Sequence, residues 1–402
     1  GSGVVTIGVI VSFLGMARQL SQTIGQASMQ VAMIAMGLAG ASRVFALIDE
    51  EPEEDDGYVT LVRAEWGADG VLKETNDKSG IWAWKHPHKA DGTVTYTPLK
   101  GDIRLEDVDF GYTPEKLVLH DITLYAKPGQ KIAFVGSTGA GKTTLFRLLA
   151  TLLNPDDGVA TVDGFDIVGQ YKEIRKRVGY MPGRFSLYPD LSVEENLEFF
   201  AALFGVGVKD NYDLIAPIYT QIEPFRKRRA GKLSGGMKQK LALCCALIHR
   251  PSVLFLDEPT TGVDAVSRSE FWDMLSELKS KGISILVSTP YMDEACRCDR
   301  VALCNNGKIL GIDTPAGITE RFDEPLYALS GDDMYGLLVE ARRIKGVKEC
   351  YPFGESHHLV ADSMFDSDEF AAHLNGQGFH NVSIRPVEPG IEDVFIKLMQ
   401  HE

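Results

Sequence analysis

A glycine-rich segment of the chain has the residue types and spacing of a phosphate-binding loop. Its glycines let backbone N–H groups converge on phosphate oxygens, and its lysine can place a positive charge on the terminal phosphates of a nucleotide. An apolar run at 131–135 precedes the segment and a helical pattern at 143–153 follows it, which is the context that such a loop needs. We expect the phosphates to contact Gly136, Ser137, Thr138, Gly139, Ala140, Gly141, Lys142, Thr143 and Thr144.

Two carboxylates end a second apolar run further along the chain. Asp257 and Glu258 follow 254–256 directly. Asp257 can then ligate Mg²⁺ together with the Thr143 hydroxyl, while Glu258 can polarise an attacking water. Acids at a strand end can also simply cap a loop, but the phosphate loop upstream favours the catalytic interpretation. The pattern therefore predicts that ATP and Mg²⁺ bind and that Glu258 acts as the general base.

A third motif, Leu233–Gln239, places a serine and two glycines at the start of a long apolar helix. A helix that begins in this way is a second site suited to anions. The motif is weak by itself, but it lies between the phosphate loop and the two carboxylates. With these three motifs, nearly the whole chain resembles the ATP-binding cassette (ABC) transporter family.

The resemblance implies an α/β fold of the phosphate-loop class, with a parallel-sheet core, an antiparallel β subdomain and a helical subdomain. Tyr112 is placed like the family's adenine-stacking aromatic residue, and Thr260–Asp264 resembles its D-loop. The family also implies a head-to-tail dimer with a second cassette, identical or different. There Ser234, Gly235 and Gly236 would contact the γ-phosphate held by the partner. A membrane permease domain would be the other partner, at the cytoplasmic face of the cell membrane.

The chain departs from the family pattern at two positions. Gly183 stands where the family has a glutamine that contacts Mg²⁺ and water, and Pro290 stands where it has a histidine that contacts the γ-phosphate. Neither residue type occurs nearby, in 180–190 or 285–295. We therefore expect tight ATP binding and slow hydrolysis by the chain alone. The alternative is an ATP-gated cassette that hydrolyses poorly and pairs with a competent partner.

The residues before the cassette divide into two segments. Residues 1–50 are almost free of charge and rich in small residues, which predicts the truncated end of a permease membrane helix; a buried helix of a soluble protein is the alternative. Residues 51–102 begin with an acidic run and continue as a linker with a β-hairpin insertion. In this stretch an alternating set of aromatic and histidine residues is expected to form a packed face rather than a metal site: Trp82, Trp84, His86 and His88.

Strand and helix patterns alternate over 103–322, which indicates a nucleotide-binding domain with a mostly parallel sheet covered on both sides. A capping box at Ser192 and Glu195 predicts a helix that runs to about residue 204. Residues 323–402 resemble a small accessory α+β domain, with helices at 335–344 and 367–376 and strands at 358–361 and 381–385. No chemical role is predicted for it.

Two subfamily patterns meet near residue 145. The first part resembles a half-exporter of the multidrug and lipid type, whereas the remainder resembles the ATP-binding subunits of ABC-2 efflux systems, notably at Ser288–Glu294 and Ile391–Phe395. The chain is therefore hypothesised to join two genes, naturally or artificially. A continuous genomic read across codons 100–190 tests this hypothesis.

The composition disfavours other functions. The net charge of −15 argues against nucleic acid as a partner, and the basic run Arg226–Arg229 is expected to be a solvated turn. The cysteines lack the spacing of a disulfide framework or a zinc site. A soluble ABC ATPase that acts on ribosomes or DNA is a further alternative, disfavoured by the single cassette and the apolar N-terminal segment.

Overall fold

A computed structural model of the chain describes residues 13–22, 60–67, 71–75, 81–87, 93–98, 101–113, 115–184 and 186–400. The chain divides into two units, 1–58 and 59–402. In the first unit, residues 13–22 are helical and exposed, and the rest of the predicted membrane-derived helix lies outside the described residues. Within the described part of the chain, no helix combines the length and the apolar character needed to cross a membrane.

A six-stranded sheet with the order β10-β11-β12-β7-β13-β14 forms the centre of the second unit. Its strands pair in parallel, except that β14 is antiparallel to β13. Every residue of β7, β11 and β12 is buried, which explains their nearly continuous apolar sequences and confirms the predicted parallel core. The strands are β7 Lys131–Val135, β10 Val178–Met181, β11 Val253–Asp257, β12 Ser284–Thr289, β13 Arg300–Asn305 and β14 Lys308–Asp313.

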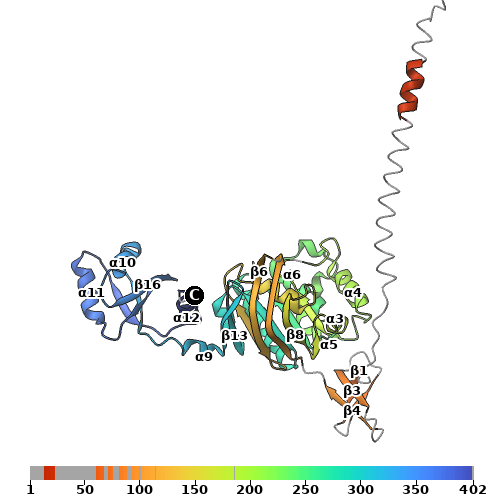
Figure 1. The fold of residues 1–402 in the computed structure, drawn as a ribbon, viewed down its shortest axis with the longest axis horizontal. Helices are drawn as coiled ribbons and strands as arrows, with labels where there is room; N and C mark the ends of the chain where they lie inside the picture. Colours follow the sequence, from red (N-terminus) through yellow and green to blue (C-terminus); the bar gives the residue numbers. More distant parts are fainter. Residues whose placement is uncertain are drawn as a thin grey trace, which may run out of the picture. The chain divides into compact units, whose positions relative to one another are not determined.

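Helices flank this sheet, and a group of them forms the helical subdomain (Figure 1). The predicted capping box opens α4, because the Ser192 hydroxyl accepts from the Glu195 N–H and the Glu195 carboxylate accepts from the Ser192 N–H. The helix predicted over 143–153 is shorter, since α2 ends at Leu149 and Thr151 takes a positive φ of 59°. The helices are α2 Lys142–Leu149, α3 Tyr171–Arg175, α4 Val193–Leu203, α5 Tyr212–Tyr219, η1 Glu223–Phe225, η2 Ala230–Lys232, α6 Gly235–Leu247, α7 Ala265–Ser280, α8 Met292–Ala295 and α9 Pro315–Thr319.

Two further sheets are antiparallel. One has the order β6-β5-β8-β9, and its apolar residues share a buried cluster with α2 and the central sheet. The other has the order β2-β1-β3-β4 and confirms the strands predicted in the insertion where they are described. Trp82, Trp84 and His86 belong to β3, but their side chains and His88 lie outside the described residues. The strands are β1 Thr60–Trp66, β2 Leu72–Glu74, β3 Ile81–Pro87, β4 Val94–Pro98, β5 Ile103–Thr113, β6 Lys116–Ala126, β8 Asp157–Val162 and β9 Phe165–Asp166.

The C-terminal residues form an α+β region, as predicted (Figure 1). Its sheet has the order β16-β17-β15-β18 and shares a small core with α10 and α11. Helix α12 instead contributes Ile391, Val394 and Phe395 to the main cluster, which also contains Ile318 and Phe322 around α9. The elements are β15 Leu326–Ser330, α10 Met334–Ala341, β16 Val347–Phe353, β17 Ser356–Ala361, α11 Ser367–Gly376, β18 Ser383–Pro386 and α12 Ile391–Gln400.

Candidate nucleotide-binding site

The predicted motifs converge at one edge of the central sheet, where the parallel strands end. The register pairs Val135 with Thr289, Ser288 with Asp257 and Leu256 with Met181, so the last residues of β7, β12, β11 and β10 lie side by side. Loops that follow the carboxyl ends of parallel strands are the usual ligand sites of such sheets. The phosphate loop begins at this edge. Glu258, Pro290 and Gly183 lie there too, in the loops that follow β11, β12 and β10.

The phosphate loop depends on glycine at two close approaches. A Cβ at Gly136 would lie 2.1 Å from the carbonyl oxygen of Cys304, so no larger residue fits there without a shift of the backbone. Gly141 has a positive φ of 91° and is the N-cap of α2. The loop tip at 137–139 is exposed, and α2 begins directly behind it. This arrangement presents free N–H groups and the positive end of a helix dipole to an anion.

Lys142 lies between the loop and the two carboxylates. Its side chain is buried, and its ammonium donates to the carbonyl oxygens of Gly136 at 2.7 Å and Ser137 at 2.9 Å. Burial lowers the pKa of Lys142, and the nearby charges of Glu258 and Asp257 act in the opposite direction. The structure therefore brings the loop and the acidic pair to one place, as the sequence predicted.

Thr143 and Asp257, the predicted metal ligands, are in direct contact. The Thr143 hydroxyl donates to Asp257 Oδ1 at 3.1 Å, and the buried Ser288 hydroxyl donates to the same oxygen at 2.5 Å. Hydroxyl and carboxylate oxygens are the hard ligands that Mg²⁺ prefers, and this ion usually takes only one or two protein ligands beside phosphates and water. The donor set therefore fits Mg²⁺ bound with a nucleotide.

Glu258 has a strained backbone that its neighbours hold in place. Its φ is +48°, in the left-handed region that is unfavourable for residues other than glycine. Its N–H donates to the carbonyl and the hydroxyl oxygen of Ser288, both at 3.0 Å. Sequence analysis missed Ser288 as a site residue. A signal was present, because this serine ends an apolar strand at the same edge as Asp257.

Tyr112 lies beside the phosphate loop, on β5. Its ring is largely exposed, at 55%, and its hydroxyl is 3.1 Å from the Thr144 hydroxyl. Arg147 of α2 donates to the same phenol oxygen at 3.4 Å. Arg147 also interacts with Tyr180, whose pKa is raised to about 12 by burial and by the charge of Asp257. The exposed ring of Tyr112 is thus available to a planar base, whereas Arg147 and Tyr180 were not predicted.

Ser234, Gly235 and Gly236 begin α6 and lie away from the phosphate loop. The Ser234 hydroxyl caps the helix by accepting from the Met237 N–H at 3.4 Å. A Cβ at Gly235 would lie 3.1 Å from the Gly262 carbonyl oxygen, and one at Gly236 would lie 2.9 Å from the Ser267 hydroxyl. This motif therefore packs on the D-loop and the start of α7, and Ser234 and Gly235 remain exposed.

Gly183 lies next to Asp257, one of the predicted metal ligands, and Pro290 follows the neighbouring strand β12. A Cβ at Gly183 would lie 3.1 Å from the carbonyl oxygen of Asp257 and 3.7 Å from its Oδ2. Pro290 directly follows β12, one residue after Thr289. Neither residue offers a polar side chain to this edge of the sheet.

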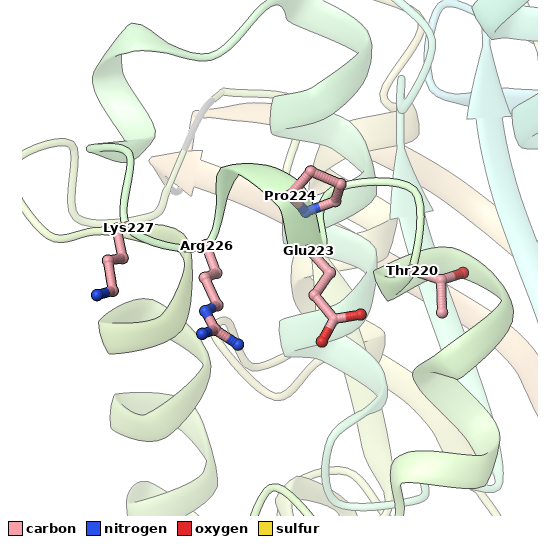
Figure 2. Close-up of a pocket in the computed structure, with 5 residues that line it drawn as sticks. All are labelled: Thr220, Glu223, Pro224, Arg226 and Lys227. Atoms are coloured by element: carbon pink, nitrogen blue, oxygen red, sulfur yellow. The ribbon is translucent and has the colours of Figure 1, made fainter.

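A shallow pocket elsewhere does not belong to this site. Figure 2 shows it between α5 and η1, lined by Thr220, Glu223, Pro224, Arg226 and Lys227. The basic run that forms one side is exposed, as expected for a solvated turn. Its backbone is fixed, because the N–H groups of Val193 and Glu194 donate to the carbonyl oxygens of Arg228 and Arg226.

Comparisons with known proteins show to which family the chain is similar. The family model described as ABC transporter matches residues 119–261. The chain is 40% identical over 283 residues to the probable multidrug ABC transporter ATP-binding protein YbhF of Escherichia coli K12, covering 69% of this chain and 48% of that protein. It is 32% identical to the Nod factor export ATP-binding protein I of Burkholderia thailandensis, covering 72% of this chain and 94% of that protein.

Among the solved structures that resemble the chain is one with similarity in both fold and sequence. It is an ATP-binding subunit of an ABC transporter, with 29% identity and a TM-score of 0.51, covering 55% of this chain and 92% of that one. The chain spans about half the length of YbhF, so that relative contains sequence with no counterpart here.

Proposed function

Because the chain belongs to the ATP-binding proteins of ABC transporters, we propose that it couples ATP binding and hydrolysis to the export of a substrate through a membrane permease domain. Membership of the family supports ATP binding and, in general, hydrolysis. The names of the relatives, multidrug transport and Nod factor export, support efflux as the direction. The observation that carries the proposal is the contact between Thr143 and Asp257 at 3.1 Å, which joins the two predicted halves of the site.

Each site residue has a proposed role. Tyr112 stacks on the adenine, and residues 136–144 hold the phosphates, with Lys142 as the charged contact. Thr143 and Asp257 hold Mg²⁺, which supplies charge neutralisation on the phosphates when bound. Glu258 accepts a proton from the attacking water as general base. The contacts of Glu258 with Ser288 support this role, because they fix its backbone beside Asp257.

The assembly is proposed to be a head-to-tail dimer of cassettes, identical or different, attached to a permease at the cytoplasmic face of the cell membrane. The exposure of Ser234 and Gly235 supports it, since these residues are accessible to the nucleotide of a partner. The proposed domains are a permease helix end at 1–50, a linker with a hairpin insertion at 51–102, the nucleotide-binding domain at 103–322 and an accessory domain at 323–402.

Phosphate release tests the assignment of the base. Substitution Glu258→Gln keeps the shape of the side chain but removes its ability to accept a proton. We expect turnover to fall by about 100-fold or more while ATP affinity stays within about twofold of wild type. Hydrolysis that survives this substitution would exclude Glu258 as the base.

A second candidate function is an ATP-gated subunit that binds ATP and hydrolyses it poorly. Gly183 and Pro290 favour it, since neither supplies a side-chain contact to the metal ligands. Phosphate release by the purified chain, with and without candidate partner cassettes, separates the two functions. Turnover that appears only with a partner supports the second candidate.

A further inference from the structure

A buried carboxylate beside the nucleotide site has partners on several elements. Glu294, on the short helix α8, is only 2% exposed. Its Oε1 accepts a hydrogen bond from the Thr260 hydroxyl at 2.7 Å, and its Oε2 accepts one from the Thr289 hydroxyl at 2.5 Å. Arg268 of α7 adds an ion pair at 3.7 Å. Both threonines are buried, so water does not compete for these bonds.

Together with the backbone, these contacts form a closed ring of residues that includes Glu258. Thr260 follows Glu258 by two residues in the D-loop, and Thr289 follows Ser288 at the end of β12. Ser288 in turn accepts from the Glu258 N–H and donates to Asp257. The path from Glu258 through Thr260, Glu294, Thr289 and Ser288 therefore returns to Glu258. Glu294 is the member that joins the D-loop to the strand end.

The ring includes Glu258, the residue of the site with a strained backbone. A left-handed φ is unfavourable at a residue other than glycine and persists only where the surroundings hold the backbone in place. Ser288 holds the N–H of Glu258, and Glu294 holds the segments on both sides. A further support secures the ring, because the Tyr291 N–H donates to the Thr289 hydroxyl at 3.0 Å and Arg268 lies 4.4 Å from the Tyr291 ring.

We infer that Glu294 is a positioning residue for hydrolysis: it fixes the D-loop and the end of β12 relative to each other, so that the Glu258 carboxylate stays aimed at the attacking water. This inference rests on the proposed role of Glu258. It gains weight from Gly183 and Pro290, because neither residue has a polar side chain that could help to hold Glu258.

Steady-state kinetics of the full chain test the inference. Glu294→Ala should lower kcat by about tenfold to 100-fold, since small displacements of a catalytic group have effects of this size. KM for ATP should stay within about twofold, because the hydrogen bonds described for Lys142 and Tyr112 involve no member of the ring. Glu294→Gln can still bond both threonines, through its oxygen and its amide nitrogen, and should recover most of the lost kcat. The matched control is Glu277→Ala, which removes an exposed glutamate paired with Lys281 on α7.

Coupling between ring members gives a second measurement. If Glu294 acts through Thr260, the double variant Glu294→Ala with Thr260→Val should be no slower than Glu294→Ala alone. Additive losses, an unchanged kcat in Glu294→Ala, or a KM that rises in parallel with the fall in kcat would each overturn the inference.

Hydrogen exchange of the Glu258 amide covers the cases in which turnover is too slow or Glu294→Ala does not fold. The amide should exchange at least about tenfold faster in Glu294→Ala, or in Thr289→Val, than in Glu277→Ala, because its acceptor Ser288 is less well held. Equal exchange in all variants would overturn the inference. This readout does not depend on Glu258 chemistry, so it separates a failure of the ring from a failure of the proposed base.

Discussion

Two sets of residues at the nucleotide site differ in the polar groups that they contribute. At the ends of β7 and β11, Lys142, Thr143 and Asp257 form a connected set of charged and polar groups. At the ends of β10 and β12, Gly183 and Pro290 contribute no polar side chain, although both follow the same edge of the sheet. We propose from this difference that nucleotide binding and nucleotide turnover depend on separate residues. The first set has the residues that the family resemblance predicts, whereas the second lacks the glutamine and the histidine.

The first prediction tests whether the phosphate loop provides the affinity for ATP. Lys142→Ala removes the buried ammonium that lies over the loop, and a lost contact to a charged group costs about 1.5–3 kcal/mol. We expect ATP affinity, measured by calorimetry, to fall by about 100-fold at the upper end of that range. Lys176→Ala is the control, since its ammonium makes an exposed ion pair with Glu173. An affinity within threefold of wild type would mean that the loop does not carry the binding energy.

The second prediction tests whether the missing glutamine at position 183 limits turnover. Gly183 is not among the positive-φ glycines, but a Cβ there would lie 3.1 Å from the Asp257 carbonyl oxygen, so a glutamine requires a shift of a few tenths of an ångström. Gly183→Gln should raise kcat by about threefold to tenfold, because an amide near the metal ligands can orient the attacking water. ATP affinity should change by less than about twofold. Gly183→Ala adds the Cβ without the amide and should give no gain. An equal kcat in both variants would refute a missing glutamine as the cause of slow turnover.

Local sequence patterns predicted the phosphate loop and the acidic pair well. The phosphate loop and the acidic pair each follow a strand that is buried along its whole length, so a continuous apolar run marks them in the sequence. The ring around Glu258 could not be predicted in this way. Two of its hydrogen bonds join residues far apart in the chain, Thr260 with Glu294 (34 positions) and Glu258 with Ser288 (30 positions). The parallel register of β11 and β12 brings these residues together.

Other misses also have local causes. The early end of α2 depends on the left-handed backbone of Thr151, a residue type that carries no such signal. In the accessory region, β16 escaped prediction because exposed and buried residues do not alternate regularly along it. The motif at 391–395 was noticed only as a resemblance, whereas the structure gives it a packing role in α12.

The third prediction tests whether the accessory region can be destabilised without a change in ATP affinity. Asp393 of α12 is buried and accepts hydrogen bonds from His358 at 2.6 Å, the Gly390 N–H at 2.7 Å and the Tyr351 hydroxyl at 2.8 Å. Burial alone would raise the pKa of Asp393, but these bonds outweigh it and hold the pKa below its usual value. The stabilisation is therefore present at neutral pH and is lost as the pH falls below about 4 toward the pKa of the folded state.

Asp393→Asn should lower the free energy of unfolding by about 2 kcal/mol at pH 7, measured by urea denaturation followed at the accessory region. The difference from wild type should shrink as the pH falls below about 4, because the wild-type carboxylate then becomes protonated as well. ATP affinity at pH 7 should not change, since the partners of Asp393 all lie within 351–390. Asp323→Asn is the control, because the ion pair of Asp323 with Lys397 is exposed and contributes little to stability. A loss of ATP affinity in Asp393→Asn would show that the accessory region supports the nucleotide site, and the binding set would then extend beyond the strand ends.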